Sequence, residues 1–186
     1  DGIYTDWPNR WSSDGGRDES VFANVVQPAS VLDIGCGNGH TLEYLADVWP
    51  NTRLYGIDIS PVAIQLARER VPTAKFFCGK IDIFPHEVEL AVVMGVAEHF
   101  YDLSELGKIK RALTVDGKIY LEVPNCLSYS DTQDEGFRKH GVQSEWHLRR
   151  DTWEKEICSQ GYKIEKSLIG NKNTWEFIWV LRKWMN

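Results

Sequence analysis

VLDIGCGNGH, residues 31–40, gives the clearest indication of the fold of this chain. The mostly apolar residues 31–34 run into a loop with glycine at every second position, and a helical pattern begins at about residue 38. A strand, a glycine-rich loop and a helix in this order are typical of open α/β sheets, whose ligands lie beyond the carboxyl ends of the strands. Glycines in such a loop let backbone N–H groups approach a ligand closely.

The rest of the chain repeats the alternation of strand and helix. Strands are predicted at residues 31–34, 53–57, 75–78, 89–94, 118–123, 163–169 and 175–181. Helices are predicted at residues 38–48, 61–70, 103–113 and 151–160. The last two strands are joined only by a turn and form a hairpin. The predicted fold class is therefore α/β: a doubly wound, mostly parallel seven-stranded sheet with a C-terminal antiparallel hairpin.

Length and composition limit the classes of protein. The 186 residues, of which 42% are hydrophobic, fit a single domain over residues 1–186. A net charge of −6 gives no general attraction to phosphate backbones, so no nucleic-acid partner is expected. The four cysteines lack zinc-site spacing and indicate reduced thiols. With no apolar run near the roughly 20 residues of a membrane span and no signal-peptide pattern, we expect a cytoplasmic protein without a membrane partner.

Two classes of ligand compete for the glycine loop: a dinucleotide, and a nucleoside that carries a positive charge. The dinucleotide fingerprint is G-x-G-x-x-G, whereas this loop is G-x-G-x-G with His40 where the third dinucleotide glycine would stand. Asp33 beside the loop would repel a pyrophosphate and suits an ammonium or sulfonium group. Asp58, at the end of the second strand, can accept both hydroxyls of a ribose. These features favour a cationic amino acid joined to a nucleoside.

On these residues the sequence resembles the class I S-adenosylmethionine-dependent methyltransferases. VLDIGCGNG resembles their first motif, YGIDIS their acidic second motif, and ELAVVMGVAEHF their fourth-strand motif. LTVDGKIYLEVPN resembles the following turn and fifth strand, although many members have L-K-P-G-G where this chain has LTVDG. The resemblance extends over residues 31–181 and implies a Rossmann-like methyltransferase fold with S-adenosylmethionine as the cofactor.

The resemblance also implies a role for each motif. The loop from Asp33 to Gly39 would surround the methionine part of the cofactor, and Asp58 would hold the ribose. Asp82 with Ile83 would meet the adenine, and the end of the fourth strand would lie under the transferring methyl group. Each aspartate could instead be a helix cap or a solvated loop carboxylate. The expected cofactor-binding residues are Asp33, Gly35, Cys36, Gly37, Gly39, Asp58, Ile59, Asp82, Ile83, Met94 and Gly95.

A hydroxyl acceptor would need a base, and two histidines are candidates. His99 follows the fourth strand, and His147 lies in residues 124–150, a substrate-side insertion where family members build the acceptor pocket. His99 could instead pack at a helix entrance, and His147 could make a surface hydrogen bond. Glu98 and Asp102 are close to His99 in sequence, but no metal is expected.

Two further segments bear on the acceptor. Residues 124–150 carry basic and aromatic side chains that could receive an anionic small molecule, a nucleotide sugar or a glycan, or could form a solvated loop. Residues 1–29 form a candidate lid, with Tyr4, Arg10 and Trp11 as possible contacts.

The leading hypothesis is an enzyme that transfers a methyl group from S-adenosylmethionine to a small molecule or sugar, at oxygen. The alternatives are a nucleic-acid or protein methyltransferase, and a non-catalytic module that binds the cofactor. The N/D-P-P-Y motif found in many enzymes that methylate adenine or glutamine amide nitrogens is absent, because residues 94–97 are MGVA. A dinucleotide oxidoreductase is the remaining rival.

Overall fold

The computed structural model describes residue 22 and residues 25–125, 134–140, 143–169 and 176–184. The chain divides into two compact units, residues 1–84 and 85–186, and each is described by itself. In the described part of the chain, no helix combines the length and apolar character needed to cross a membrane. The predicted turn at residues 170–173 and most of the candidate lid, including Tyr4, Arg10 and Trp11, lie outside the described residues.

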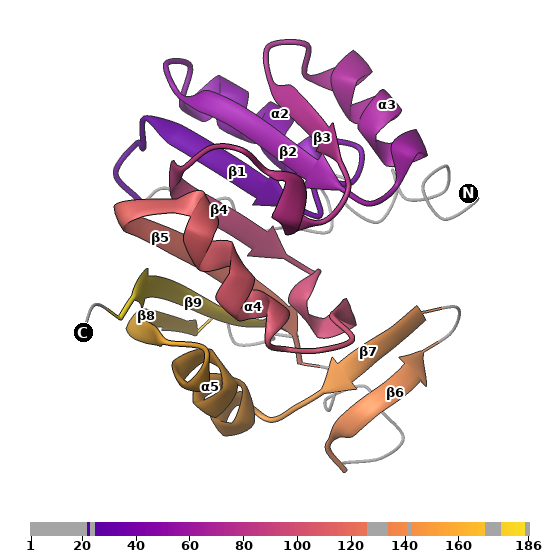
Figure 1. Cartoon of the computed structure of the whole chain (residues 1–186), viewed down its shortest axis with the longest axis vertical. Helices are drawn as coiled ribbons and strands as arrows, with labels where there is room; N and C mark the ends of the chain where they lie inside the picture. The colour runs from indigo at the N-terminus through magenta and orange to yellow at the C-terminus, as the bar shows by residue number, and fades with distance from the viewer. Residues whose placement is uncertain (1–21, 23–24, 126–133, 141–142, 170–175, 185–186) are drawn as a thin grey trace. The chain divides into compact units, whose positions relative to one another are not determined.

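The first unit contains three parallel strands in the order β3-β2-β1 (Figure 1). They are β1 (Ser30–Ile34), β2 (Arg53–Asp58) and β3 (Lys75–Cys78). All five residues of β1 are buried, as expected of a strand that is covered on both faces. The register pairs Ile34 with Ile57 and Asp58 with Cys78, so the three strands end close to one another.

Two helices follow the first two strands and pack against β2, β3 and each other: α2 (His40–Val48) and α3 (Pro61–Arg70). Leu42 and Leu45 of α2 and Ala67 of α3 are fully buried, which fixes the helix faces that meet the sheet. The Ser60 hydroxyl caps α3 by accepting the backbone N–H of Ala63 at 3.2 Å. After β3 the chain makes only a short 3₁₀ turn, η2 (Ile81–Ile83).

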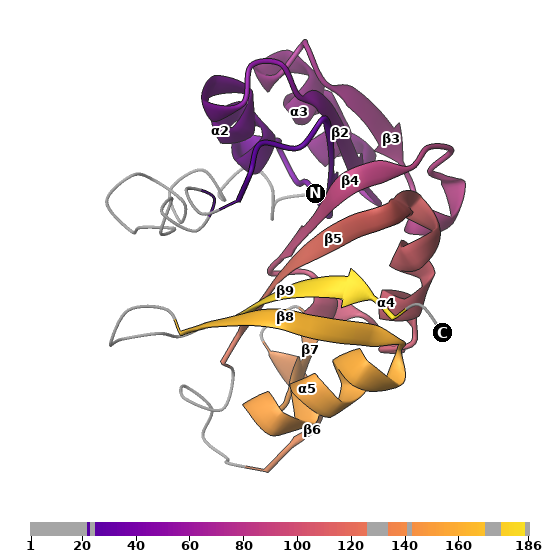
Figure 2. The same ribbon diagram turned by 90° about the vertical axis from the view of Figure 1, so that its left-hand side faces the viewer.

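The second unit has strands in the order β4-β5-β9-β8 (Figure 2). Parallel strands β4 (Val88–Met94) and β5 (Leu113–Pro124) are followed by an antiparallel pair, β9 (Glu176–Lys183) and β8 (Tyr162–Ile169). Helix α5 (Arg150–Ser159) packs on β8, and Trp153 and Trp179 are fully buried. Over both units the strands confirm the predicted class, α/β and mostly parallel with a C-terminal antiparallel hairpin.

The structure differs from the sequence prediction between residues 103 and 117. Only α4 (Glu105–Lys108) is α-helical, and a 3₁₀ turn, η4 (Ile109–Ala112), leads directly into β5. The turn predicted at Asp116-Gly117 is a bulge within β5, because Leu113 pairs with Val88 and Lys118 with Leu90. A Cβ atom at Gly117 would lie 2.9 Å from the Val88 carbonyl oxygen, so the bulge requires glycine.

A separate two-stranded hairpin occupies part of the predicted insertion at residues 124–150. Its strands are β6 (Gly136–His140) and β7 (Gln143–His147), which pair antiparallel. Sequence patterning does not predict these strands, because the segment is polar and lacks the apolar alternation of a half-buried strand.

Candidate functional site

The glycine loop of the first unit crosses the carboxyl end of β2. The backbone N–H groups of Gly35 and Cys36 both donate to the Ile57 carbonyl oxygen, at 2.7 and 3.1 Å. Gly35, Gly37 and Gly39 have φ values of +71°, +52° and +85°, a region that other residues seldom occupy. The alternating glycines therefore allow the sharp bend that brings this backbone over the strand end.

Asp58 is hydrogen bonded directly to the loop. Its Oδ2 accepts the backbone N–H of Gly37 at 3.0 Å, and its Oδ1 accepts the backbone N–H of Ser60 at 2.8 Å. The residue is only 7% exposed. A carboxylate oxygen can accept more than one hydrogen bond, so both oxygens retain capacity for a ligand hydroxyl. The structure thus places Asp58, the residue predicted to bind the ribose, beside the middle of the glycine loop.

A second carboxylate, that of Asp33, lies near the loop and is 3% exposed. Both carboxylates affect the thiol of Cys36. Burial raises the pKa of this thiol, and the negative charges of Asp33 and Asp58 raise it further. Cys36 is therefore a neutral, buried thiol and not a nucleophile. The same two charges make the loop a favourable place for a cationic group.

Apolar side chains border the ends of β2 and β3. Ile59 is 71% exposed and Ile83 is 51% exposed, although both are large hydrophobic residues. The backbone around Gly79 is closely packed. The Gly79 N–H donates to the Asp58 carbonyl oxygen at 2.8 Å, and a Cβ atom at Gly79 would lie 2.8 Å from Ile83 Cδ1. Asp82, between Ile81 and Ile83 in η2, is exposed. Together these residues can offer a planar nucleobase both apolar contacts and a polar partner.

The remaining predicted site residues belong to the second unit. Met94 ends β4 and is buried, and Gly95 has a φ of +63° and donates to the Glu122 carbonyl oxygen at 3.1 Å. The next residues form a 3₁₀ turn, η3 (Ala97–His99), in which Glu98 is buried. Within this unit the structure brings η3 against strand β7.

His99 is held in a defined orientation by that contact. Its Nδ1 lies 3.0 Å from the Ser144 carbonyl oxygen, and because a carbonyl only accepts, Nδ1 carries the proton. In the neutral ring Nε2 is then the basic nitrogen. Nε2 lies 3.8 Å from Oε1 of buried Glu98, which can stabilise the ring once it is protonated. The imidazole is 30% exposed, so a ligand can reach it.

His147 has a different environment. It ends β7 and is 3% exposed, and its Nε2 lies 3.3 Å from Oε1 of Glu145, which is also buried. Residues two apart on a strand share a face, so this pair points to the same side of the hairpin. Because both residues belong to β7, their contact orients the His147 ring within its own strand.

An aromatic cluster that involves Tyr101 joins η3 to the hairpin. The Trp146 Nε1–H donates to the Phe100 carbonyl oxygen at 2.8 Å. The Phe137 ring centroid lies 5.1 Å from that of Trp146 and 5.9 Å from that of Tyr101, which is 83% exposed. Phe137 and Trp146 are among the aromatic side chains of the predicted insertion at residues 124–150, whereas the sequence gives no signal for Tyr101 beyond its position two residues after His99. Among the described residues, no group of three or more potential ligands could hold a metal ion.

Comparison with known proteins supports the family that the sequence resembles. A sequence profile described as "Methyltransferase domain" matches residues 31–117, which include the glycine loop, Asp58 and the end of β4. Residues 31–117 are therefore similar to a methyltransferase domain, which supports the class I S-adenosylmethionine-dependent methyltransferase family that the sequence motifs resemble. S-adenosylmethionine is accordingly the cofactor, and the buried carboxylates and spare acceptor sites of the loop fit its sulfonium and ribose groups.

Individual methyltransferases show how far the likeness extends. The chain is 31% identical over 109 residues to trans-aconitate 2-methyltransferase of Rhodopseudomonas palustris (strain BisB5), covering 55% of this chain and 41% of that protein. It is 29% identical over 106 residues to malonyl-[acyl-carrier protein] O-methyltransferase of Acetivibrio thermocellus, covering 54% of this chain and 38% of that protein. The chain therefore spans about two-fifths of the length of these relatives.

A solved structure covers more of the chain. It is the 1,6-didemethyltoxoflavin-N1-methyltransferase of Burkholderia thailandensis with bound 1,6-didemethyltoxoflavin and S-adenosylhomocysteine. The TM-score is 0.71 at 17% identity, with 97% of this chain and 80% of that chain covered. At this identity the likeness establishes the fold, which is the Rossmann-like methyltransferase fold predicted from the sequence.

Proposed function

We propose that this chain transfers the methyl group of S-adenosylmethionine to an oxygen atom of a small molecule or sugar. The observation that carries the proposal is the hydrogen bond between Gly37 N–H and Asp58 Oδ2, because it joins the two predicted cofactor-binding elements in one buried site. The name of the O-methyltransferase relative supports oxygen as the acceptor atom, and that of the trans-aconitate methyltransferase supports a small acceptor.

Different residues of the first unit would bind different parts of the cofactor. The remaining acceptor capacity of Asp58 suits the ribose hydroxyls, and the charges of Asp33 and Asp58 suit the positive methionine end. Exposed Ile59 and Ile83 would cover the adenine, with Asp82 as its polar partner. When bound, S-adenosylmethionine supplies a methyl group that its sulfonium charge has already activated, so the protein has mainly to bind, align and exclude water.

His99 is the candidate base for a hydroxyl acceptor. The Ser144 carbonyl fixes the Nδ1–H tautomer, which leaves the lone pair on Nε2. Nε2 would take the acceptor's hydroxyl proton as the oxygen forms its bond to the methyl carbon, and Glu98 would stabilise the resulting imidazolium. We place His147 outside the proton transfer, since its ring is buried and paired with Glu145 of its own strand.

The acceptor would bind over η3 and the hairpin of the second unit. Exposed Tyr101 and half-exposed Phe137 offer aromatic faces there, and Lys139 lies on the Phe137 side of β6 because residues two apart share a face. Aromatic faces and a nearby ammonium suit a sugar ring or a planar, anionic small molecule.

A carboxylate acceptor is the alternative that most affects the mechanism. Trans-aconitate is a carboxylic acid, and a carboxylate needs no base because it has already lost its proton at neutral pH. His99 would then contribute little to the rate. A cytoplasmic location, a single domain over residues 1–186, a lid at 1–29 and a substrate-side insertion at 124–150 remain predictions.

Calorimetric titration and an acceptor survey test the proposal together. We expect S-adenosylhomocysteine to bind, and NAD, which carries a pyrophosphate, not to bind. Transfer of labelled methyl from S-adenosylmethionine should then be followed into hydroxy acids, carboxylic acids, sugars, nucleic acid and protein. Labelling of nucleic acid or protein alone would replace the small-molecule proposal, and binding without any labelling would favour a non-catalytic module.

A further inference from the structure

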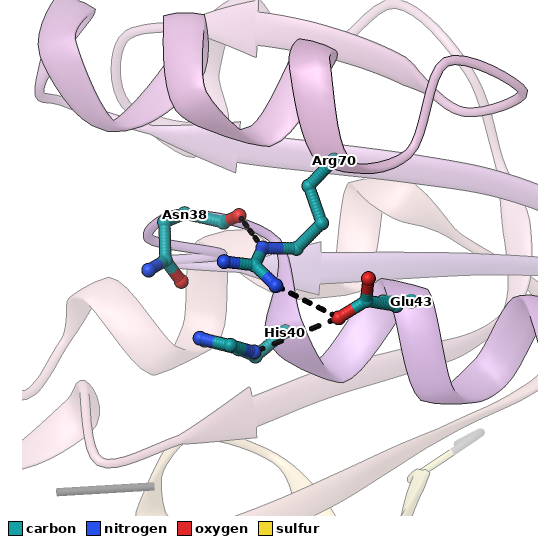
Figure 3. A network of polar contacts seen from close by, with 4 residues as sticks. All are labelled: Asn38, His40, Glu43 and Arg70. Carbon is teal, nitrogen blue, oxygen red and sulfur yellow. Dashed lines mark hydrogen bonds and ion pairs between the residues drawn. The ribbon is translucent and has the colours of Figure 1, made fainter. Parts of the chain in front are cut away.

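Arg70, the last residue of α3, connects that helix to the glycine loop and to α2 (Figure 3). Its Nε donates to the backbone carbonyl oxygen of Asn38 at 3.0 Å. Its Nη1 donates to Glu43 Oε2 in the first turn of α2 at 2.9 Å, and the same oxygen lies 3.7 Å from Nδ1 of His40. One guanidinium therefore binds two acceptors on different segments, which its fork of fixed donors permits.

Three successive loop residues are each held by a different neighbour. The Gly37 N–H is bonded to Asp58, and the Asn38 carbonyl is bonded to Arg70. Gly39 packs so closely on α3 that an added Cβ atom would lie 3.2 Å from Ala67 Cα and Cβ. Asp58 holds the loop from the end of β2, whereas Ala67 and Arg70 hold it from α3.

We propose that Arg70 is a positioning residue for the cofactor: by holding the Asn38 carbonyl it keeps the glycine loop in its binding conformation before the cofactor arrives. The inference rests on the proposed cofactor site. The side chain of Arg70 contacts the backbone of the loop at Asn38 and contacts α2 at Glu43. A protein whose binding conformation is only partly populated binds its ligand more weakly by that fraction. Loss of Arg70 should therefore weaken binding and loosen the loop.

Glu43 has a subordinate part in this arrangement. Its side chain is 48% exposed, and ion pairs between exposed side chains contribute little by themselves. Its carboxylate orients the guanidinium toward Asn38. We therefore expect Glu43→Ala to weaken cofactor binding less than Arg70→Ala does.

Arg68 provides a matched control. It lies on the same helix, and its Nη2 also donates to a backbone carbonyl, that of Phe76 in β3, at 3.3 Å. Arg68→Ala removes the same kind of bond from the same helix but leaves the glycine loop untouched. A general weakening of α3 should affect both variants, whereas a positioning effect on the loop should appear only in Arg70→Ala.

The test measures S-adenosylhomocysteine binding by calorimetry and amide hydrogen exchange of residues 35–40. We expect the Kd to rise about tenfold in Arg70→Ala, equivalent to about 1.4 kcal/mol, and to stay within about twofold of wild type in Arg68→Ala. Exchange in the free protein should be faster in Arg70→Ala alone, and saturating S-adenosylhomocysteine should restore protection. Arg70→Lys, whose single ammonium cannot hold both acceptors in the same way, should be intermediate and serves if Arg70→Ala does not fold.

Each outcome decides a different question. Equal Kd values and equal exchange in Arg70→Ala and Arg68→Ala would overturn the positioning role while leaving the cofactor site intact. Faster exchange that persists at saturating ligand would also overturn it, because the loop would then be damaged and not merely released. Failure of the wild-type chain to bind S-adenosylhomocysteine would overturn the proposed function itself.

Discussion

The backbone N–H of Gly37 lies 3.0 Å from Asp58 Oδ2 and donates a hydrogen bond to it. The two residues are 21 positions apart, yet the bond makes the glycine loop and the end of β2 one structural element. Because Asp58 Oδ1 also accepts the Ser60 N–H, the same carboxylate sets the start of α3. The residue proposed to bind the ribose is therefore also the residue that shapes the site around it.

Replacement of Asp58 should separate these two contributions. Asp58→Ala removes both acceptors of a 7% exposed residue, so we expect a loss of about 1–3 kcal/mol in unfolding free energy and at least tenfold weaker S-adenosylhomocysteine binding. Asp58→Asn keeps one oxygen and should be milder in stability but similar in binding, because its amide cannot accept at both positions. Calorimetry and thermal unfolding measure the two effects, with the exposed Asp47→Asn as control. Unchanged binding in Asp58→Ala would remove Asp58 from the site.

The glycines at positions 37 and 39 should respond differently to a methyl group. An alanine at 39 would need a φ of +85° and would press on Ala67, so we expect Gly39→Ala to lower stability by about 1–3 kcal/mol. An alanine at 37 would meet no atom within 4 Å, and its methyl group would enter open space at the proposed cofactor position. Gly37→Ala should therefore cost less stability but weaken S-adenosylhomocysteine binding. Chemical denaturation and calorimetry on both variants check this, and an equal loss of binding with no difference in stability would contradict it.

The sequence predicts the first unit well because its signals are local. Strand β1, the glycine loop, α2 and β2 follow one another directly along the chain, and the parallel register of β1 and β2 then brings Asp58 to the loop. The roles of Arg70 and Ala67 are not visible in this way. They depend on a contact between the C-terminal part of α3 and the glycine loop that precedes α2. The residues in contact are about 30 positions apart in the sequence.

The second unit is harder to predict for the opposite reason. His99 acquires its tautomer from the carbonyl of Ser144, 45 residues away, and the strand that carries Ser144 belongs to a polar hairpin without an apolar pattern. The helix predicted over residues 103–113 shortens because Leu113 already pairs with Val88 in the sheet. Sheet pairing here overrides the helical periodicity that the sequence displays.

Glu135 should make stability depend on acid pH. A hydrogen bond from the Thr152 side chain, and then one from the Arg149 backbone N–H at 2.6 Å, lower the pKa of Glu135 below its ordinary value of 4.5. A carboxyl group whose pKa is lower in the folded than in the unfolded protein stabilises the folded state at pH values above its ordinary pKa. This stabilisation is lost as the pH falls through the pKa of the folded protein. In urea unfolding, Glu135→Gln should be less stable than wild type near neutral pH, and the gap should close below pH 4.5. The exposed Glu69→Gln is the control, and a gap independent of pH would contradict the assignment.

Replacement of His99 by asparagine should distinguish a hydroxyl from a carboxylate acceptor. The asparagine amide can still donate to the Ser144 carbonyl but has no basic nitrogen at the place of Nε2. With a hydroxyl acceptor we expect kcat to fall about 10²- to 10⁴-fold, the usual contribution of a general base. S-adenosylhomocysteine binding should be unchanged, because the cofactor residues of the first unit are untouched. His86→Asn, an exposed replacement in the same unit, should leave both quantities at wild-type values. A full rate in His99→Asn with a hydroxyl acceptor would exclude His99 as the base, whereas a full rate with a carboxylic acid alone would identify an acceptor that enters the site already deprotonated.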